Sequence, residues 1–282
     1  MQEHWYTPLV EAIPQRHSVR SYLAQALPEE QLAQINHFSA ELKVPFEHQV
    51  KCQVFQAEPG KKLYNNGINP IDNIALISET DLLSVSKVGF VGQLIMLYAV
   101  SLGISTCWFG HYKLAEVGKY IAGIATPERL KESTLGYGYG RHIDVGERVI
   151  CCIPIGHKQE NSKRLVDFVA AKILSKRKPL ADLVEDKSSI NNLPPELMRA
   201  FDLARMAPSA GNMQMWRFGI TDNFRTLTVA KPVGYKHFKW EHPDVDIGIA
   251  AAQLWLGLLN EGYQPQIELT QDADRALWRL RI

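Results

Sequence analysis

Two long apolar segments constrain the fold of this 282-residue chain more than any other feature. Val88–Ile104 carries no charged residue, and Val245–Leu259 carries only Asp246. The first segment lies at the lower limit of the roughly 17–25 residues that a membrane span needs, and Gln93, Ser101 and three glycines dilute it. A helix that is apolar on nearly all sides is also typical of a protein core. We therefore expect two fully buried helices and no membrane span.

The two apolar segments are part of a weak internal repeat. Each half of the chain has a short helix that starts after a Leu-Pro pair, a strand-forming stretch, and then a long apolar helix followed by glycine. The alternative is that two unrelated amphipathic helices share a common type of start. The matching positions are Leu27-Pro28 with Leu193-Pro194, Gln93-Leu94 with Gln253-Leu254, and Gly103 with Gly262.

Short β-branched, alternating or apolar runs predict strands between these helices. The predicted strands are Gln49–Gln56, Ile74–Ile77, Arg148–Ile155, Arg217–Thr221 and Thr226–Val229. Long helices mixed with such strands predict an α+β fold, with helices packed on sheets. The polar stretch Gln159–Arg177 predicts a connector that contains a helix at Leu165–Leu174. We divide the chain into a first half, 1–165, and a second half, 166–282, packed as one globular unit.

Composition excludes several classes of protein. Lys plus Arg number 31 and Asp plus Glu 30, which gives a net charge of +1 and no nucleic-acid footprint. The four cysteines form no C-x-x-C pair and the nine histidines no H-E-x-x-H, so we expect no metal site. Nothing matches a dinucleotide fingerprint, a Walker A loop or a serine elbow. The N-terminal sequence lacks a signal peptide, which predicts a cytoplasmic location.

Two basic segments are candidates for binding a phosphate. Arg16–Tyr22 places two arginines and a hydroxyl within five residues, and a guanidinium can form paired hydrogen bonds with a phosphate. Taken alone, this segment is more typical of a solvated basic turn. Ser175–Leu180 contains three consecutive basic residues and is equally compatible with a surface patch.

Two further segments carry other chemistry. Ala207–Phe218 combines a turn with two side-chain amides, whose donors and acceptors suit the edge of a flavin pyrimidine. The alternative is an ordinary connection from a loop to a strand. Gly103–Gly110 follows the first apolar segment and contains Cys107, whose apolar neighbours favour an inert buried thiol over a nucleophile.

Taken together, these segments resemble the FMN-dependent nitroreductase family. The family signatures are R-R-S-x-R-x-F, the long central helix with its G-L-G-x-x-W-x-G turn, I-G-x-P, K-x-R-x-P-L and A-P-S-x-x-N-x-Q-P-W-x-F. The similar segments here are, in that order, Arg16–Tyr22, Val88–Gly110, Pro154–His157, Arg177–Leu180 and Ala207–Phe218. The resemblance implies a nitroreductase-like α+β fold, with central mixed sheets flanked by the long buried helices.

The order of the motifs departs from the family pattern. The A-P-S-x-x-N segment normally follows soon after R-R-S-x-R, but here it comes after Arg177. The expected place holds FSAELKVPFEHQ, and the second half lacks an R-R-S-x-R segment. Family members are homodimers with FMN at the subunit interface. The chain therefore resembles a divergent single-chain branch, a fused pseudo-dimer in which each half keeps one side of a single site.

The resemblance assigns the cofactor-binding residues one by one. Around the FMN phosphate and ribityl chain it places Arg16, His17, Ser18, Arg20 and Arg177. Near the ring face or its N5 edge it places Trp108, Phe109 and Gly110. Lining the isoalloxazine it places Pro208, Ser209, Ala210, Asn212 and Gln214. Ser175 stands where many members have lysine and Met215 where proline is usual, so the loop geometry differs here.

The implied activity is an FMN-dependent oxidoreductase that passes hydride from NAD(P)H through the flavin to a nitroaromatic, quinone or similar acceptor. The cofactor supplies the redox chemistry, so no catalytic side chain is assigned. A single chain could act as a monomer, because both sides of the site are already joined. The alternatives are another flavin reaction, such as reductive dehalogenation or flavin destruction, a cofactor-free binding protein, and a membrane-associated protein.

Overall fold

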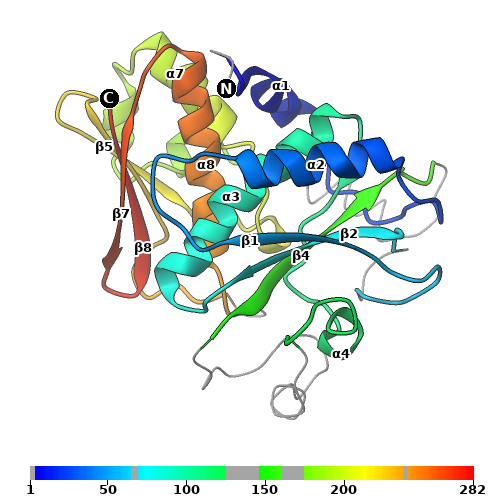
Figure 1. Ribbon diagram of the computed structural model, residues 1–282. Helices are drawn as coiled ribbons and strands as arrows, with labels where there is room; N and C mark the ends of the chain where they lie inside the picture. Colours follow the sequence, from blue (N-terminus) through cyan, green and yellow to red (C-terminus); the bar gives the residue numbers. More distant parts are fainter. Residues whose placement is uncertain (1–3, 65–68, 125–145, 161–174, 238–239) are drawn as a thin grey trace.

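Two four-stranded sheets flank a pair of long central helices, α3 (Leu82–Ser101) and α8 (Asp244–Asn260) (Figure 1). The computed structural model describes residues 4–64, 69–124, 146–160, 175–237 and 240–282. Both helices coincide with the apolar segments that the sequence singled out. Each also ends at a glycine in the left-handed conformation, Gly103 or Gly262, which satisfies the requirements of a helix C-terminus.

The two sheets share one topology. In each, the chain runs through two strands, a long helix and two more strands, and the sheet orders are β1-β2-β4-β3 and β5-β6-β8-β7. Neighbouring strands are antiparallel, whereas the bridges Ser18–Thr106 and Val184–Phe218 are parallel, so each sheet is mixed, as predicted. The strands are β1 (Lys51–Gln56), β2 (Asp72–Ser78), β3 (Ser105–Thr106), β4 (Arg148–Gly156), β5 (Arg217–Thr221), β6 (Thr226–Ala230), β7 (Gln266–Asp272) and β8 (Arg275–Arg281).

The shorter helices repeat between the halves as well. Helices α2 and α7 both follow a proline with nearly the same backbone angles: φ −55° and ψ 140° at Pro28, φ −53° and ψ 141° at Pro194. Acidic residues occupy the first turn of each, where the helix dipole favours them. The remaining elements are α1 (Thr7–Gln15), α2 (Glu29–Glu41), α4 (Leu114–Val117), α7 (Pro195–Ala204), and the 3-10 turns η1 (Leu180–Asp182), η2 (Lys187–Ile190) and η3 (Ala210–Asn212).

Glycines set the close contact between α3 and α8. A Cβ atom at Gly89 would overlap the carbonyl group of Val245, and one at Gly248 would overlap the carbonyl group of Ser86. The contacts are reciprocal, as in a two-fold arrangement. The glycines Gly89 and Gly248 lie 159 positions apart in sequence, as do the two terminal glycines, Gly103 and Gly262.

This spacing corrects one predicted match of the repeat. With a spacing of 159 residues, Gln93 of the first half aligns with Ala252 of the second half. The predicted equivalence of Gln93 with Gln253 is therefore wrong by one residue. Both glutamines are nevertheless fully buried. Because both are surrounded by apolar residues, the sequence alone did not reveal that the alignment of the two helices was shifted by one residue.

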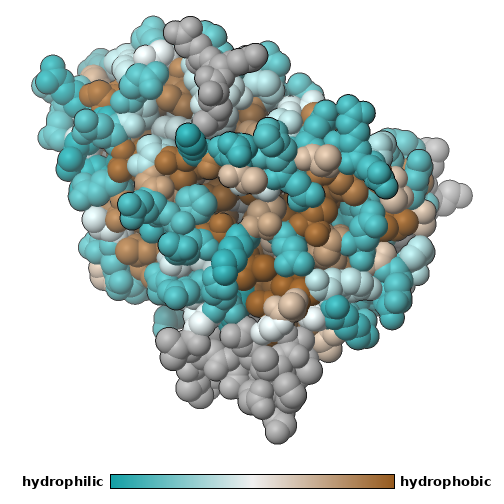
Figure 2. Space-filling view, in the orientation of Figure 1, coloured by the Kyte–Doolittle hydropathy of each residue, from teal (hydrophilic) through white to brown (hydrophobic). Residues whose placement is uncertain are grey.

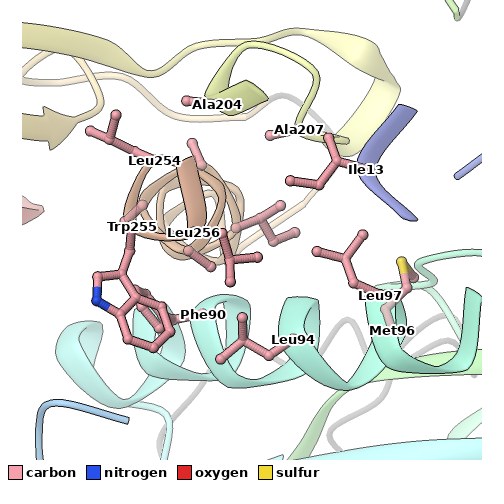
Figure 3. Packing of buried hydrophobic residues seen from close by; sticks show 14 of the residues in the cluster. Ile13, Phe90, Leu94, Met96, Leu97, Ala204, Ala207, Leu254, Trp255 and Leu256 are labelled. Atoms are coloured by element: carbon pink, nitrogen blue, oxygen red, sulfur yellow. The ribbon is translucent and has the colours of Figure 1, made fainter. Parts of the chain in front are cut away.

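The core surrounds the crossing of the two helices. Figure 3 shows Phe90, Leu94 and Leu97 of α3 facing α8, while Ile13 of α1 and Ala204 of α7 lie on other sides of α8. Among the described helices, α3 alone is long and apolar enough to cross a membrane, but 72% of its most apolar window is buried inside the protein, as in the core of a soluble protein. The face in Figure 2 carries hydrophilic side chains interspersed with separate apolar patches.

Five strand predictions are confirmed to within two residues, but the sequence reading missed the hairpin β7–β8. Its strands are rich in Arg, Gln and Glu, and only alternate residues of β8 are buried. The predicted helix Leu165–Leu174 and the boundary between residues 165 and 166 lie outside the described residues.

We expect Gly89→Ala to lower the free energy of unfolding by about 1–3 kcal/mol, because the added methyl group forces the helix backbones apart. The intrinsic preference of a helix for alanine over glycine acts in the opposite direction, by about 1 kcal/mol. Urea denaturation measures the net effect, with Ser101→Ala on the exposed end of α3 as the control. A more stable Gly89→Ala variant would contradict the close approach.

Candidate functional site

The segment Arg16–Tyr22 is extended and lies against the end of β3. Ser18 bridges Thr106 in parallel, and the Val19 N–H donates to the Thr106 carbonyl at 3.0 Å. Its far end pairs with the chain after β4, where Tyr22 bridges Lys158. The segment is thus part of the first sheet, not the solvated turn that its composition alone favoured.

Arg16 is a buried cation without a carboxylate partner among the described residues. Its side chain is 7% exposed, its Nη1 donates to the Ser18 hydroxyl at 3.2 Å, and its Nε is buried without a partner. Burial and the positive charge of Arg177 lower the pKa of Arg16 to about 10. Burying an unpaired charge is costly unless an opposite charge compensates it. The site therefore fits an anion.

Cations from both halves meet around Arg16. Arg20 also contributes to the lowered pKa of Arg16, and its Nη1 donates to the Ser18 carbonyl at 3.1 Å. Partial burial and the charges of Arg16, Lys158 and Arg177 lower the pKa of His17. Since Arg177 belongs to the second half, the structure brings together the two basic segments that the sequence placed far apart. Three guanidinium groups suit a phosphate.

The predicted ring-binding loop, residues 208–214, has an unusual backbone. Gly211, Asn212 and Gln214 have φ values of 58°, 57° and 50°, in the left-handed region. Two of these residues are not glycine, so this conformation stores strain, which often marks a functional site. The Gln214 N–H donates to the Ser209 hydroxyl at 2.9 Å and closes the loop on itself.

The two amides in this loop bind the basic segment of the same half. Asn212 Oδ1 accepts from Arg177 Nη1 at 2.7 Å, and Gln214 Oε1 accepts from the Lys178 N–H at 2.9 Å. Both amide NH₂ groups donate to the Lys176 carbonyl, at 2.8 and 3.1 Å. The side chains assigned to the flavin ring therefore have protein partners in this structure.

Asp246, in the first turn of α8, anchors the same loop. Its carboxyl oxygens accept from the Ala210 N–H at 3.2 and 3.0 Å. Burial raises the pKa of Asp246 to about 8, against the lowering effect of that hydrogen bond. Burial, Cys152 and Asp246 together raise the pKa of Cys151 in β4. Sequence reasoning did not assign Asp246 a role, although it is the one charge in its apolar segment.

The side chains of the third predicted group, Trp108 and Phe109, contact other parts of the protein in this structure. The Trp108 Nε1–H donates to Gln93 Oε1 at 3.0 Å, and the Phe109 ring stacks on Tyr64 with centroids 4.6 Å apart. A Cβ at Gly110 would overlap Trp240.

Cys107 instead adjoins the cationic cluster. Burial raises the pKa of the Cys107 thiol, while nearby Arg20 and Arg16 act in the opposite direction. The net shift is upward, so the thiol stays neutral, in agreement with the predicted lack of a nucleophile.

A cavity of about 10 Å³ lies on the other side of Gly110, room for about one water molecule and not for a flavin. Its lining residues are Gly110, Tyr112, Arg148, Val149, Ile150, Glu241 and His242.

Across the residues that the structure describes, no group of three His, Cys, Asp or Glu side chains could hold a metal.

Aromatic side chains fill the place related to this loop by the repeat. By the order of elements, the loop between α7 and β5 corresponds to the segment between α2 and β1, which carries Phe46. The Phe46 ring centroid lies 4.9 Å from that of Phe90 and 5.0 Å from that of Trp278. Phe90 and Trp278 are completely buried, and Trp278 Nε1–H donates to the Ser86 hydroxyl at 2.9 Å. The two related places therefore differ: one holds cations and a strained loop, the other an aromatic cluster.

Residues 8–123 and 136–258 match the family described as "Putative TM nitroreductase". The chain belongs to this nitroreductase family. The match covers both halves, so the family unit is the two-half chain, and the predicted family is confirmed.

The nitroreductase fold is confirmed by a solved structure of similar length. A "putative nitroreductase" from Thermotoga maritima has a TM-score of 0.62 and 22% identity, and the similarity covers 100% of this chain and 96% of that one. A Bacteroides fragilis nitroreductase with bound FMN has a TM-score of 0.38 and 18% identity, over 55% of this chain and 91% of its own.

A third solved structure comes from Bacteroides thetaiotaomicron and is described as a "Putative NADH dehydrogenase/NAD(P)H nitroreductase". It has a TM-score of 0.38 and 18% identity, over 56% of this chain and 91% of its own. No curated protein matches the sequence of this nitroreductase-family chain.

The raised pKa of Asp246 predicts a pH-dependent stability. The folded state holds a proton up to about pH 8, whereas the ordinary pKa of an aspartate, which applies to the unfolded chain, is 3.8. The free energy of unfolding should therefore fall as the pH rises between about 4 and 8, by at most about 1.4 kcal/mol per pH unit from this group. Urea denaturation across this range should show a shallower fall for Asp246→Asn, and equal slopes would contradict the assignment.

Proposed function

We propose that the chain is an FMN-dependent oxidoreductase that takes hydride from NAD(P)H and delivers it to a nitroaromatic, quinone or similar small acceptor. Membership of the nitroreductase family supports the reaction class. The observation that carries the proposal is Arg16, buried, without an acidic partner among the described residues, and facing a second arginine from the other half. A flavin phosphate supplies the charge that this arrangement lacks.

The phosphate end of the proposed site is formed by both halves. Arg16, Ser18 and Arg20 come from the first half, where the bridge to Thr106 fixes their backbone. Arg177 comes from the second half, and its charge already lowers the pKa of Arg16. A phosphate that accepts hydrogen bonds from these groups would relieve their mutual repulsion, which is a direct electrostatic reason for binding.

The ring end is proposed from the loop and its neighbours. Pro208, Ser209 and Ala210 line the ring in this proposal, and Asp246 holds their loop through the Ala210 N–H. Bound FMN supplies the hydride-transfer chemistry, and the protein binds and orients it. Contact of Trp108, Phe109 and Gly110 with the ring stays a prediction.

We further propose that each chain binds a single flavin, as a fused pseudo-dimer whose halves meet near residues 165–166. The aromatic cluster of Phe46, Phe90 and Trp278 supports this, because the segment between α2 and β1 packs into the core instead of forming a loop like residues 208–214. With both sides of the site in one chain, the proposal requires no second subunit, and a cytoplasmic location agrees with the proposed reductants.

A second candidate is a binding protein that takes phosphate-bearing ligands without flavin chemistry. It is favoured by one observation, namely that Asn212 and Gln214 already have protein partners. Absorption bands near ~450 nm in the purified or FMN-reconstituted protein distinguish the two, since only the oxidoreductase carries an oxidised flavin. Oxidation of NAD(P)H with a quinone acceptor then tests the reaction itself.

We expect one FMN per chain. Flavin released by denaturation is counted against protein concentration after full loading. A ratio near one agrees with a single site formed by both halves, because arginines of the two halves act on each other around Arg16. A ratio near two would rule out the fused site.

Arg16→Ala should weaken FMN binding about 10- to 150-fold, the range for loss of a charge-assisted hydrogen bond. Cys107→Ala is the matched control, since this buried thiol adjoins the same cluster but carries no charge. Fluorescence titration with FMN measures both dissociation constants. Unchanged binding by Arg16→Ala together with a loss in Cys107→Ala would refute the phosphate assignment.

A further inference from the structure

We propose that Asn212 and Gln214 are positioning residues, which hold segment Ser175–Lys178 so that Arg177 presents its guanidinium to the same phosphate as Arg16. The inference rests on the proposed function. It changes the role of the two amides, because the sequence resemblance assigned both of them to the flavin ring. In this role they act on the cofactor only through Arg177.

Asn212 uses both ends of its amide on the basic segment. Its Oδ1 accepts from Arg177 Nη1 at 2.7 Å, and its Nδ2 donates to the Lys176 carbonyl at 2.8 Å. One side chain therefore fixes both the guanidinium and the backbone next to it. Both polar atoms of the Asn212 side chain therefore already have a partner in the basic segment.

Gln214 completes the same attachment from two residues further along. Its Oε1 accepts from the Lys178 N–H at 2.9 Å, and its Nε2 donates to the carbonyls of Lys176 and Asn212 at 3.1 and 3.2 Å. The side chain is only 2% exposed. Gln214 thus holds the backbone on both sides of Arg177, while Asn212 holds its side chain.

Arg177 retains a free end after these contacts. Its Nε donates to the Met206 carbonyl at 3.2 Å, and its Nη1 is bound by Asn212. Its Nη2 has no bonded partner within the described ranges of the chain. Partial burial, together with the charge of Arg205, lowers the pKa of Arg177. A guanidinium held at two nitrogens and free at the third is oriented for an external anion.

Electrostatic repulsion explains why Arg177 needs the two amides to hold it near Arg16. Arg177 lies close enough to Arg16 to lower the pKa of that buried group, and Arg20 adds a third positive charge. Like charges repel, so without an attachment segment Ser175–Lys178 would move away from Arg16. Four hydrogen bonds from the two amides oppose that repulsion.

The strained backbone of the loop also helps to hold segment Ser175–Lys178. Asn212 and Gln214 lie at φ 57° and 50°, which turns two nearby side chains toward one segment. Asp246 holds the start of this turn through Ala210. The left-handed backbone conformation therefore places both side-chain amides against residues 176–178.

The experiment compares FMN with riboflavin, which differ only by the phosphate. Asn212→Gly and Gln214→Gly remove the side chains while suiting the left-handed backbone. The matched control is Asn223→Gly, an exposed asparagine at φ 52° in the β5–β6 turn. Arg177→Ala and its double variant with Asn212→Gly measure the coupling. Dissociation constants come from flavin fluorescence titration, and inorganic phosphate is titrated separately by its effect on the melting temperature.

We expect Arg177→Ala to weaken FMN binding about tenfold or more while leaving riboflavin unchanged. Asn212→Gly and Gln214→Gly should weaken FMN in the same selective manner, and by no more than Arg177→Ala does. The double variant should match Arg177→Ala alone, and Asn223→Gly should match the parent.

Four results would overturn the inference. Equal loss of FMN and riboflavin in the amide variants would mean that the amides bind the ring. Unchanged FMN binding would mean that they do not position Arg177, and so would losses that add in the double variant. If the parent binds no flavin, the proposed function fails, and inorganic phosphate decides the inference. Stabilisation by phosphate that depends on Asn212 and Arg177 would support it, and equal stabilisation of all variants would overturn it.

Discussion

The close crossing of α3 and α8 is the contact on which the rest of the structure depends. Gly89 and Gly248 let each helix approach the backbone of the other, and the contact is reciprocal. Each helix carries its own sheet, so the crossing fixes how the two sheets face one another (Figure 1). The first turn of α8 also carries Asp246, which anchors the loop of the second half through the Ala210 N–H.

The candidate site follows from this arrangement. Each half contributes a basic segment that would be unremarkable alone, yet together they place three arginines around one buried point. Desolvation makes the unpaired Arg16 costly, and the amides of the other half hold Arg177 beside it. Keeping these charges together lowers the free energy of unfolding, and such a local cost in stability is typical of binding sites.

The sequence predicted the buried helices well. A long segment without charges, whose apolar residues are interrupted by too many polar residues and glycines for a membrane span, is best placed as a helix in the protein core. It also predicted that Arg16–Arg20 and Arg177 cooperate, although only through the family resemblance. The β7–β8 hairpin was missed because its strands are polar on one face. The partners of Asn212 and Gln214 were not predictable from local sequence, since they depend on left-handed backbone angles and on a segment some 36 residues away.

The aromatic cluster at Phe46 has an evolutionary consequence. In a symmetric homodimer every substitution occurs in both sites, so a side chain that fills one site also fills the other. In a chain with two unequal halves, Phe46 and Trp278 can strengthen the core at one place without any cost at the other. Because the two halves differ in sequence, the place around Phe46 can pack as core while the place around Arg16 keeps its buried charges, an independence that two identical subunits would not have.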